Sequence, residues 1–432
     1  MSNKFMPALL GTAILGLSAC TGAAPATPAP AGSASGGDSP ALAGEITFQT
    51  WSLKNDKFTP YFEDLIDRFT TEHPETTVNW IDQPGDGYEE KLLQQANSNS
   101  LPDVVNLQGS YAYRLAEVGM LMDLKAADPA VLDTYINGGL AEYNFESLGV
   151  DGVYGYPWYQ GSDVSWWNLE LLQKAGKTEA DLPTTNEELF AFAIDVAEQT
   201  NGEVKIISEA PKMGTLSNAG LKIFQDGKFV FNTPEAVKVI QMYKDAYAAG
   251  AMPTEALNGA YLGNIALFKE EKVAFTSAAA GFASELKSEV PTLLEKTAVT
   301  PRTGLPSLFG QGISVSSATK SPDVAVAFAQ FVTNNENQVE FLKLAQGFFP
   351  GTLEANENPD SFTSVIELPQ QKYAADVAAE AIKTAVNEYP TVANTAMDVF
   401  FGQQLALAVR GDIPIEEALQ SAEDNANETL GS

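Results

Sequence analysis

The sequence contains very little of two residue types on which much catalysis and metal binding depends. Its 432 residues include one histidine, His73, and one cysteine, Cys20. Zinc clusters, Cys-His pairs and His-dependent catalytic triads need more of these side chains than the chain offers. Glycine-rich motifs that cradle phosphate and signatures of haem or flavin binding are also missing, so we expect no cofactor.

Positive charge is scarce as well. Lys and Arg number 25 against 56 Asp and Glu, which gives a formal net charge of -31. Such a chain repels phosphate backbones, so we expect no nucleic-acid partner. Hydrophobic residues make up 44% and charged residues 19%, as in a soluble globular protein, and the length favours two domains.

The N-terminal apolar run extends from Phe5 to Leu17, which is shorter than the roughly 20 residues that a membrane-spanning helix needs. With Lys4 before it and small residues after it, the run predicts a secretory signal peptide over residues 1–19. The segment Leu17-Ser18-Ala19-Cys20 resembles the bacterial lipobox, which implies that Cys20 carries a lipid anchor. A buried thiol is the alternative, but no core surrounds this position.

Residues 20–44 are predicted to form a flexible linker behind the anchor. From Thr21 to Gly44 they are almost entirely Ala, Pro, Gly, Ser and Thr, which cannot bury enough apolar surface to become ordered. We therefore expect a globular body that is tethered to a membrane through Cys20.

Hydrophobic periodicity predicts an α/β body from Glu45 onward. A strand that ends at Trp51 is followed by an amphipathic helix that begins at Thr59-Pro60, with Thr59 as its N-cap, and ends before Pro74. A strand over 76–81, a helix over 88–96 and a strand over 103–107 come next. Strands that alternate with helices in this way favour a parallel sheet.

Two extended segments are candidates for crossings between the domains: residues 153–168, which are rich in aromatics, and residues 298–316, which are rich in Gly and Pro. Between and after them, capping patterns predict further helices. These helices begin near Thr185, Thr233, Ser321, Thr391 and Pro414.

Several segments, in this order behind the lipobox, resemble the family of sugar-binding lipoproteins of ABC importers, relatives of maltose-binding protein. They are the strand ending in Trp51, Phe69 to Pro74, Tyr88 to Leu92, Leu101 to Val105, Tyr154 to Gln160, Ser165 to Leu169, Gly310 to Ile313 and Gly347 to Pro350.

The resemblance implies a two-lobed, periplasmic-binding-protein-like (type II) α/β fold with a hinge of crossing strands, in which the lobes close around a sugar. Residues 45–158 and 302–348 would form lobe 1, and residues 159–301 and 349–432 would form lobe 2. The implied partners are a carbohydrate ligand, such as a di- or oligosaccharide, and the permease subunits of an ABC transporter.

The first crossing supplies most of the candidate ligand-binding residues. Sugars present apolar faces to aromatic rings and hydroxyls to amides and carboxylates. We expect Trp158 to stack on the sugar rather than to lie in a core, together with Tyr159, and we expect Gln160 and Asp163 to supply hydrogen bonds. Trp51 ends its strand at the edge where open α/β sheets bind ligands, and it suits a site or a structural position equally.

In lobe 2 the resemblance implies ligand contacts from Phe282, Phe401 and Asp398. The sequence departs from maltose-type relatives at Gly161, where they place a carboxylate, so specificity for maltodextrins does not follow. Four other residues are interpreted as structural or solvated: Trp80, Trp167, Glu89 and Glu90.

Two other classes of function stay open on the residues alone. A secreted glycoside hydrolase would use paired carboxylates, but no pair stands out among the 56 acidic residues, so we expect a protein that is not an enzyme. A surface adhesin would keep the lipobox without needing aromatic crossing strands.

Overall fold

The computed structural model describes residues 41–257, 264–387 and 389–431. The predicted signal peptide, Cys20 and the linker as far as Pro40 lie outside the described residues. The part of the chain that is described contains no helix that is both long and apolar enough to cross a bilayer.

The larger sheet has the strand order β11-β4-β10-β3-β1-β2, and β12 also pairs with β10. Its strands are β1 (Ala43–Trp51), β2 (Glu75–Gln83), β3 (Val104–Leu107), β4 (Tyr156–Gly161), β10 (Ser307–Val315), β11 (Phe349–Pro350) and β12 (Val386–Asn387). β1 is parallel to β2 and β3, which confirms the predicted parallel arrangement. β10 runs antiparallel to β3 and β4.

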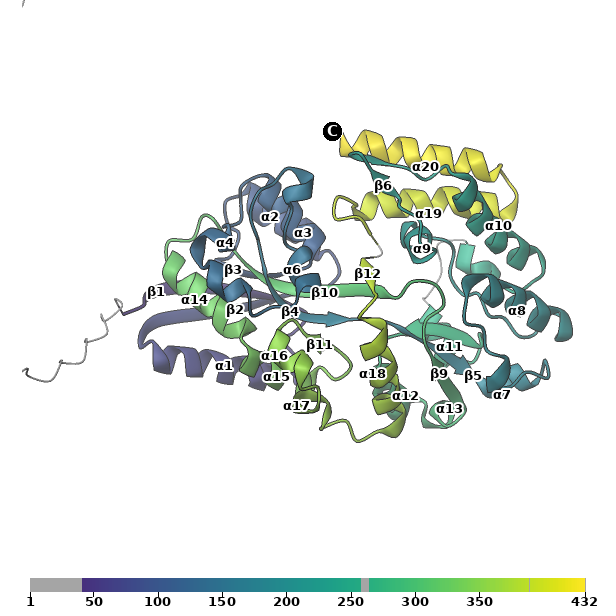
Figure 1. The fold of residues 1–432 in the computed structure, drawn as a ribbon, viewed down its shortest axis with the longest axis horizontal. Helices are drawn as coiled ribbons and strands as arrows, with labels where there is room; N and C mark the ends of the chain where they lie inside the picture. Colours follow the sequence, from purple (N-terminus) through teal and green to yellow (C-terminus); the bar gives the residue numbers. More distant parts are fainter. Residues whose placement is uncertain (1–40, 258–263, 388, 432) are drawn as a thin grey trace, which may run out of the picture. The chain divides into compact units, whose positions relative to one another are not determined.

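The smaller sheet is antiparallel and has the order β8-β5-β9. Its strands are β5 (Val164–Asn168), β8 (Phe275–Ala278) and β9 (Thr297–Thr300), and a separate hairpin pairs β6 (Phe224–Gln225) with β7 (Lys228–Phe229). Two short connections join the sheets: residues 162–163 lie between β4 and β5, and residues 301–306 lie between β9 and β10. The predicted mixed α/β fold with crossing strands is confirmed (Figure 1).

Helices cover both sheets. Up to β8 they are α1 (Thr59–Glu72), α2 (Tyr88–Asn97), α3 (Gly109–Glu117), α4 (Leu124–Ala127), α5 (Pro129–Leu132), α6 (Asn137–Ala141), α7 (Leu169–Gln173), α8 (Asn186–Gln199), α9 (Met213–Asn218), α10 (Pro234–Ala248) and α11 (Asn264–Lys269). After β8 they are α12 (Phe282–Glu289), α13 (Pro291–Leu294), α14 (Pro322–Thr333), α15 (Asn335–Leu344), α16 (Leu353–Glu357), α17 (Asp360–Thr363), α18 (Pro369–Ala381), α19 (Thr395–Arg410) and α20 (Ile415–Leu430).

Local sequence signals explain several of these boundaries. Thr185 accepts a hydrogen bond from the backbone of Glu188 and so forms the predicted capping box of α8. Thr233 caps α10 as expected. Thr59, in contrast, is the first residue of α1 rather than its cap, because Phe58 takes the N-cap position without a side-chain hydrogen bond.

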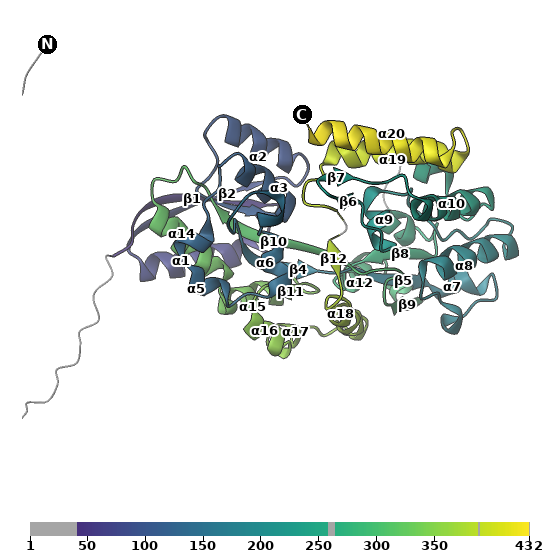
Figure 2. The same ribbon diagram turned by 45° about the horizontal axis from the view of Figure 1, so that its top comes forward.

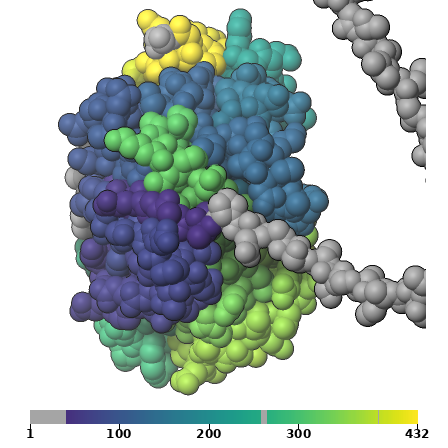
Figure 3. Space-filling model, turned by 90° about the vertical axis from the view of Figure 1, so that its left-hand side faces the viewer, coloured from purple at the N-terminus to yellow at the C-terminus, as the bar shows by residue number. Residues whose placement is uncertain are grey.

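The helices are arranged in layers around the larger sheet. Figures 1 and 2 show α2 and α3 on one side of it and α1 and α15 on the other, while α19 and α20 lie side by side and pack against α10. Figure 3 shows the start of β1, in purple, beside the green segment that leads into α14. The Ser321 hydroxyl joins these two segments by donating to the carbonyl of Glu45 at 3.1 Å.

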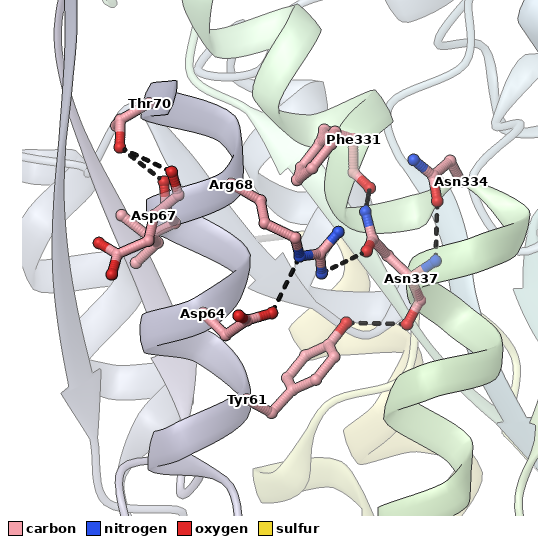
Figure 4. Close-up of polar contacts among 9 residues, drawn as sticks. Tyr61, Asp64, Asp67, Arg68, Thr70, Phe331, Asn334 and Asn337 are labelled. Carbon is pink, nitrogen blue, oxygen red and sulfur yellow. Dashed lines mark hydrogen bonds and ion pairs between the residues drawn. The ribbon is translucent and has the colours of Figure 1, made fainter. Parts of the chain in front are cut away.

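Polar side chains tie α1 to α15 across this layer (Figure 4). Arg68 Nη2 donates to Asn337 Oδ1 at 2.8 Å, and the Tyr61 hydroxyl donates to the Asn337 carbonyl at 2.8 Å. Asn337 Nδ2 donates in turn to the carbonyl of Phe331 at 2.6 Å. Asn337 is only 1% exposed, so its side-chain oxygen accepts a hydrogen bond and its side-chain nitrogen donates one without access to water.

We predict that Asn337→Ala lowers the free energy of unfolding by about 2 kcal/mol, because it leaves Arg68 and the Phe331 carbonyl without this partner. The measurement is urea denaturation of the two proteins. Asp64→Ala is the matched control: Asp64 pairs with Arg68 on the helix surface, where such a pair contributes roughly 0.5 kcal/mol or less. Equal small losses in both variants would contradict a structural role for Asn337.

Candidate functional site

A cleft of about 380 Å³ lies where the larger sheet meets the start of α19. It is lined by Glu89, Gln108, Gly109, Ser110, Tyr111, Glu142, Ser307, Leu308, Phe309, Gly310, Asn387, Tyr389, Thr391, Ala393, Asn394, Thr395 and Asp398. Its volume is near the lower end of the roughly 300 to 1,000 Å³ that is typical of small-molecule sites.

One wall begins where β3 ends. Gln108 to Tyr111 follow this strand directly and open α3, so they lie at the carboxyl end of a parallel strand, where open α/β sheets bind ligands. Trp51 supports this wall from behind: its ring stacks on Tyr88 at 5.1 Å between centroids and on Tyr111 at 6.0 Å. The ring of Tyr111 is therefore held in place at the cleft surface.

The opposite wall comes from the end of β12 and the first turn of α19. Asn394 caps this helix by accepting from the backbone of Met397 at 2.8 Å. Asp398 lines the cleft from the same turn, and its Oδ1 accepts from the backbone N–H of Met213 at 2.9 Å. The Tyr389 hydroxyl lies 3.4 Å from Asp398 Oδ2, so a carboxylate and an aromatic ring stand together on this wall.

A polar bridge connects the two walls at Glu89. Arg114 of α3 forms an ion pair with Glu89 and donates to the carbonyl of Ala393 at 3.1 Å. The other Glu89 oxygen accepts from the Thr395 hydroxyl at 3.0 Å. Glu89 is 9% exposed, so the expectation that it lies on a solvated helix face was wrong.

The floor of the cleft is the first half of β10. Phe309 is 37% exposed there and pairs with Gly161 of β4. A Cβ at position 161 would lie 2.3 Å from the Phe309 ring, so only glycine fits below it. In this structure the Phe309 ring occupies the space that a side chain at position 161 would take.

Glu142 is the most deeply buried carboxyl among the residues that line the cleft. It follows α6, is 6% exposed, and approaches β10 so closely that a Cβ at Gly310 would lie 2.6 Å from its Oε2. Burial in low-dielectric surroundings disfavours the charged form and raises the pKa of Glu142 to about 7. The carboxyl therefore changes its charge near neutral pH.

The structure corrects the expectation for Trp158. This side chain is completely buried, with its ring 4.5 Å from that of Phe341 and 6.0 Å from that of Phe62. It is absent from the cleft lining. The pairing of β4 with β10 shifts at this residue, and Trp158 and Tyr159 both pack against Phe341, so Trp158 lies on the face of the sheet that carries α1 and α15.

The other residues of the first crossing also lie outside the cleft lining. Tyr159 is half-buried between Phe341 and Phe348, with centroids at 5.4 Å and 5.1 Å. Gln160 is 2% exposed, and its Nε2 has no hydrogen-bond partner among the described protein atoms. Asp163 is half-buried in the connection between β4 and β5.

Of the residues expected from lobe 2, Asp398 alone lines the cleft. Phe282 is 4% exposed and packs edge-on against Trp166 at 5.3 Å. Phe401 is completely buried beside Phe231 at 5.0 Å. Both rings lie in hydrophobic cores, which corrects the expectation that they contact a ligand, whereas the structural interpretation of Trp167 is confirmed by its complete burial.

The sequence reasoning missed four prominent cleft residues: Tyr111, Glu142, Phe309 and Tyr389. The first could have been found, because it follows the predicted strand over 103–107 at the edge where ligands bind. Glu142 and Phe309 line the same cleft only because the segment after α6 lies against Gly310 of β10, which leaves no local signal.

Comparisons with known proteins find similarity over most of the chain. The family model described as bacterial extracellular solute-binding protein matches residues 64–395. A lactose-binding protein of Rhizobium radiobacter is 26% identical over 35% of each chain, and a candidate ABC transporter periplasmic-binding protein of Escherichia coli (strain K12) is 26% identical over 44% of this chain. These matches span 35% and 45% of the two relatives.

A solved structure extends the likeness to most of the chain. The crystal structure of a candidate oligosaccharide periplasmic-binding protein from Synechococcus sp. MITs9220 superposes with a TM-score of 0.76 at 25% identity. The superposition covers 89% of this chain and 99% of that one. The two-lobed fold is therefore shared over nearly the whole described chain.

We predict that Trp158→Ala lowers the free energy of unfolding by about 3 to 5 kcal/mol, the cost of removing a large ring from a core. Trp158→Phe is the control: it keeps an aromatic ring and removes the indole N–H, which has no partner among the described atoms, so it should cost much less. Chemical denaturation measures both. If Trp158→Ala keeps its stability, the ring does not belong to the core.

Proposed function

This chain belongs to the family of bacterial extracellular solute-binding proteins, and we propose that its cleft captures a carbohydrate for uptake by an ABC importer. Membership of this family places the protein outside the cytoplasm. The family consists of binding proteins rather than enzymes, so the carboxylates of the cleft are read as ligand contacts. A glycoside hydrolase is thereby set aside.

The observation that carries this proposal is the chemistry of the cleft lining. Tyr111, Phe309 and Tyr389 offer ring faces, and Glu142 and Asp398 offer hydrogen-bond acceptors. The amides of Gln108, Asn387 and Asn394 can both donate and accept. A sugar needs this mixture, because its C–H faces stack on rings while its hydroxyls bond to polar groups at the rim.

The names of the relatives support the same class of ligand and the same partner. Lactose, an oligosaccharide and an ABC transporter appear in the names of the three similar proteins. The volume of about 380 Å³ suits a short saccharide better than a long one. Delivery to permease subunits follows from the proposed role in an importer.

The two lobes are proposed to be residues 45–158 with 302–348, and residues 159–301 with 349–432. Strand membership supports this division, because β1, β2, β3 and β10 share the larger sheet and β5, β8 and β9 form the smaller one. β4 and β11 extend the larger sheet a few residues past these bounds, to Gly161 and Pro350, and β12, which pairs with β10, also lies outside the lobe 1 ranges. The connections next to β5 and β9 would then be the hinge.

A lipid anchor on Cys20 completes the proposal. Cys20 is the sole cysteine, it directly follows the predicted signal peptide, and a linker rich in Ala, Pro, Gly, Ser and Thr comes after it. An anchored, tethered body stays near a membrane transporter while it samples the medium. Residues 1–19 would be removed during export.

We predict that the protein binds at least one of lactose, maltotriose and arabinotriose, measured by isothermal titration calorimetry. Phe309→Ala should weaken this binding by about 2 kcal/mol, the scale of an aromatic hot spot. Tyr373→Ala is the control, because this exposed ring of α18 is not part of the cleft lining. The proposal fails if no sugar of the panel binds, or if both variants bind as the unchanged protein does.

We also predict that Cys20→Ser blocks lipid attachment. The variant should accumulate as an uncleaved precursor or appear in the medium. Metabolic labelling with a radioactive fatty acid and fractionation of cells measure this outcome. Normal labelling and membrane retention of Cys20→Ser would show that another feature holds the protein at the membrane.

A further inference from the structure

Glu142 occupies a narrow space on the floor of the cleft. Its carboxyl lies against β10 at Gly310, where any side chain would collide with it, and the residue is 6% exposed. The amide of Asn387, in the orientation that satisfies its neighbours, donates to Glu142 Oε1 at 3.2 Å and to the carbonyl of Leu308 at 3.3 Å. The carboxyl thus already acts as a hydrogen-bond acceptor at the cleft surface.

The charged and titratable groups around Glu142 provide no cation. Burial raises the pKa values of Tyr143, which is next to it in the chain, and of the half-buried Tyr159 of β4. Asp398 of α19 and Glu89 of α2 line the same cleft, and Glu89 is paired with Arg114. β10 has no charged residue, and no described residue lining the cleft is Lys, Arg or His.

The protein provides no cation beside Glu142, so a ligand that covers this carboxyl must supply a hydrogen-bond donor to it. An ionised carboxylate forms hydrogen bonds about twice as strong as those of a neutral acid, provided that a donor reaches it. A sugar hydroxyl supplies such a donor and carries no charge of its own. Because free Glu142 has a pKa of about 7, a large share of it holds a proton below neutral pH, and this proton must leave before the carboxylate can accept the hydroxyl.

We propose that Glu142 is a ligand-contacting residue that accepts a hydrogen bond from a sugar hydroxyl in its ionised form, so that binding releases a proton and becomes tighter as the pH rises through neutrality. The proton goes to the solvent and the hydroxyl keeps its own, so no other reactant is needed. This inference rests on the proposed carbohydrate function and adds a specificity-determining contact to it. Ligands that lack the hydroxyl at this position would bind weakly at every pH.

The direction of the pH effect follows from linkage. A donor to the carboxylate lowers the pKa of Glu142 in the complex, so the free protein binds more protons than the complex between the two pKa values. Affinity then increases with pH by up to about tenfold per unit below the pKa of the free protein. Above pH 8 the affinity should reach a plateau.

The test is calorimetric titration of the unchanged protein, at pH 5.5, 6.5, 7.5 and 8.5, with the sugar of the lactose, maltotriose and arabinotriose panel that binds most tightly. Two buffers of different ionisation enthalpy give the number of protons released. We expect affinity to rise at least about tenfold between pH 5.5 and 8.5. Affinity that stays level or falls over this range would overturn the proposal while leaving carbohydrate binding intact.

Two variants locate the effect. Glu142→Gln should bind the same sugar more weakly and without pH dependence, because the amide cannot ionise. Glu146→Gln, an exposed glutamate four positions along the chain and outside the cleft lining, should behave as the unchanged protein does. If Glu142→Gln retains the unchanged pH profile, another group is responsible and the assignment fails.

A measurement without ligand checks the premise. Because the pKa of folded Glu142 lies above its ordinary value, the folded state holds the extra proton between these two values, and stability declines as the pH rises through this range. The melting temperature of Glu142→Gln relative to the unchanged protein should therefore be higher at pH 8 than at pH 5. A constant difference across this range would contradict a buried, titrating carboxyl.

Discussion

The close approach of β10 to the segment after α6 is the constraint on which the cleft depends. β10 has glycine at positions 310 and 312, two residues apart and therefore on the same face of the strand. A Cβ at Gly310 would meet the Glu142 carboxyl at 2.6 Å, and a Cβ at Gly312 would meet the Tyr143 ring at 2.4 Å. Two consecutive side chains thus lie directly on the backbone of this strand.

This packing explains how β10 can hold the sheet together and also form part of the cleft. The Tyr143 hydroxyl donates to the carbonyl of Leu107 at 2.8 Å, which fixes the end of β3 beside β10. The next residues after β3 form one wall of the cleft, while Phe309 and Gly310 form its floor. The same strand continues toward β9 through residues 301–306, so a hinge motion there would move the smaller sheet relative to this floor.

The elements of the fold could be predicted where their signal is local. The alternating residues of β1, the apolar stripe of α1 and the capping box of α8 depend on neighbours a few positions apart, and the structure contains all three. The aromatic cluster Tyr156-Pro157-Trp158-Tyr159 was interpreted by its chemistry alone. Which face of the sheet Trp158 occupies depends on Phe341, a partner 183 positions away in numbering, and no pattern within β4 indicates it.

The site was harder to predict because its residues also depend on partners that are far away in the sequence. Glu142 is an example. Asp398 was expected from the resemblance, and it lines the cleft. Trp51 does not line the cleft, but its ring stacks on Tyr111, which does. Glu142 follows Ala141 in a segment with no catalytic or binding pattern, and its importance comes from Gly310 and Asn387, which are far away in the chain. When tertiary packing brings distant residues together, their chemistry depends on the contact between them, and the spacing of these residues in the sequence does not reveal it.

The state of Glu142 also shows why overall composition is a poor guide to a site in this protein. A net charge of -31 would raise the pKa of every carboxyl if distance did not matter. Salt screens exposed charges beyond about 8 Å at physiological ionic strength, so most of the 56 acidic residues have little influence on any one site. For Glu142 the cause is desolvation by the surrounding protein, whereas the exposed Glu188 has a lowered pKa because Thr184 and Thr185 donate to it. Local burial and local donors, rather than total charge, therefore decide which carboxyl can exchange a proton when a ligand arrives.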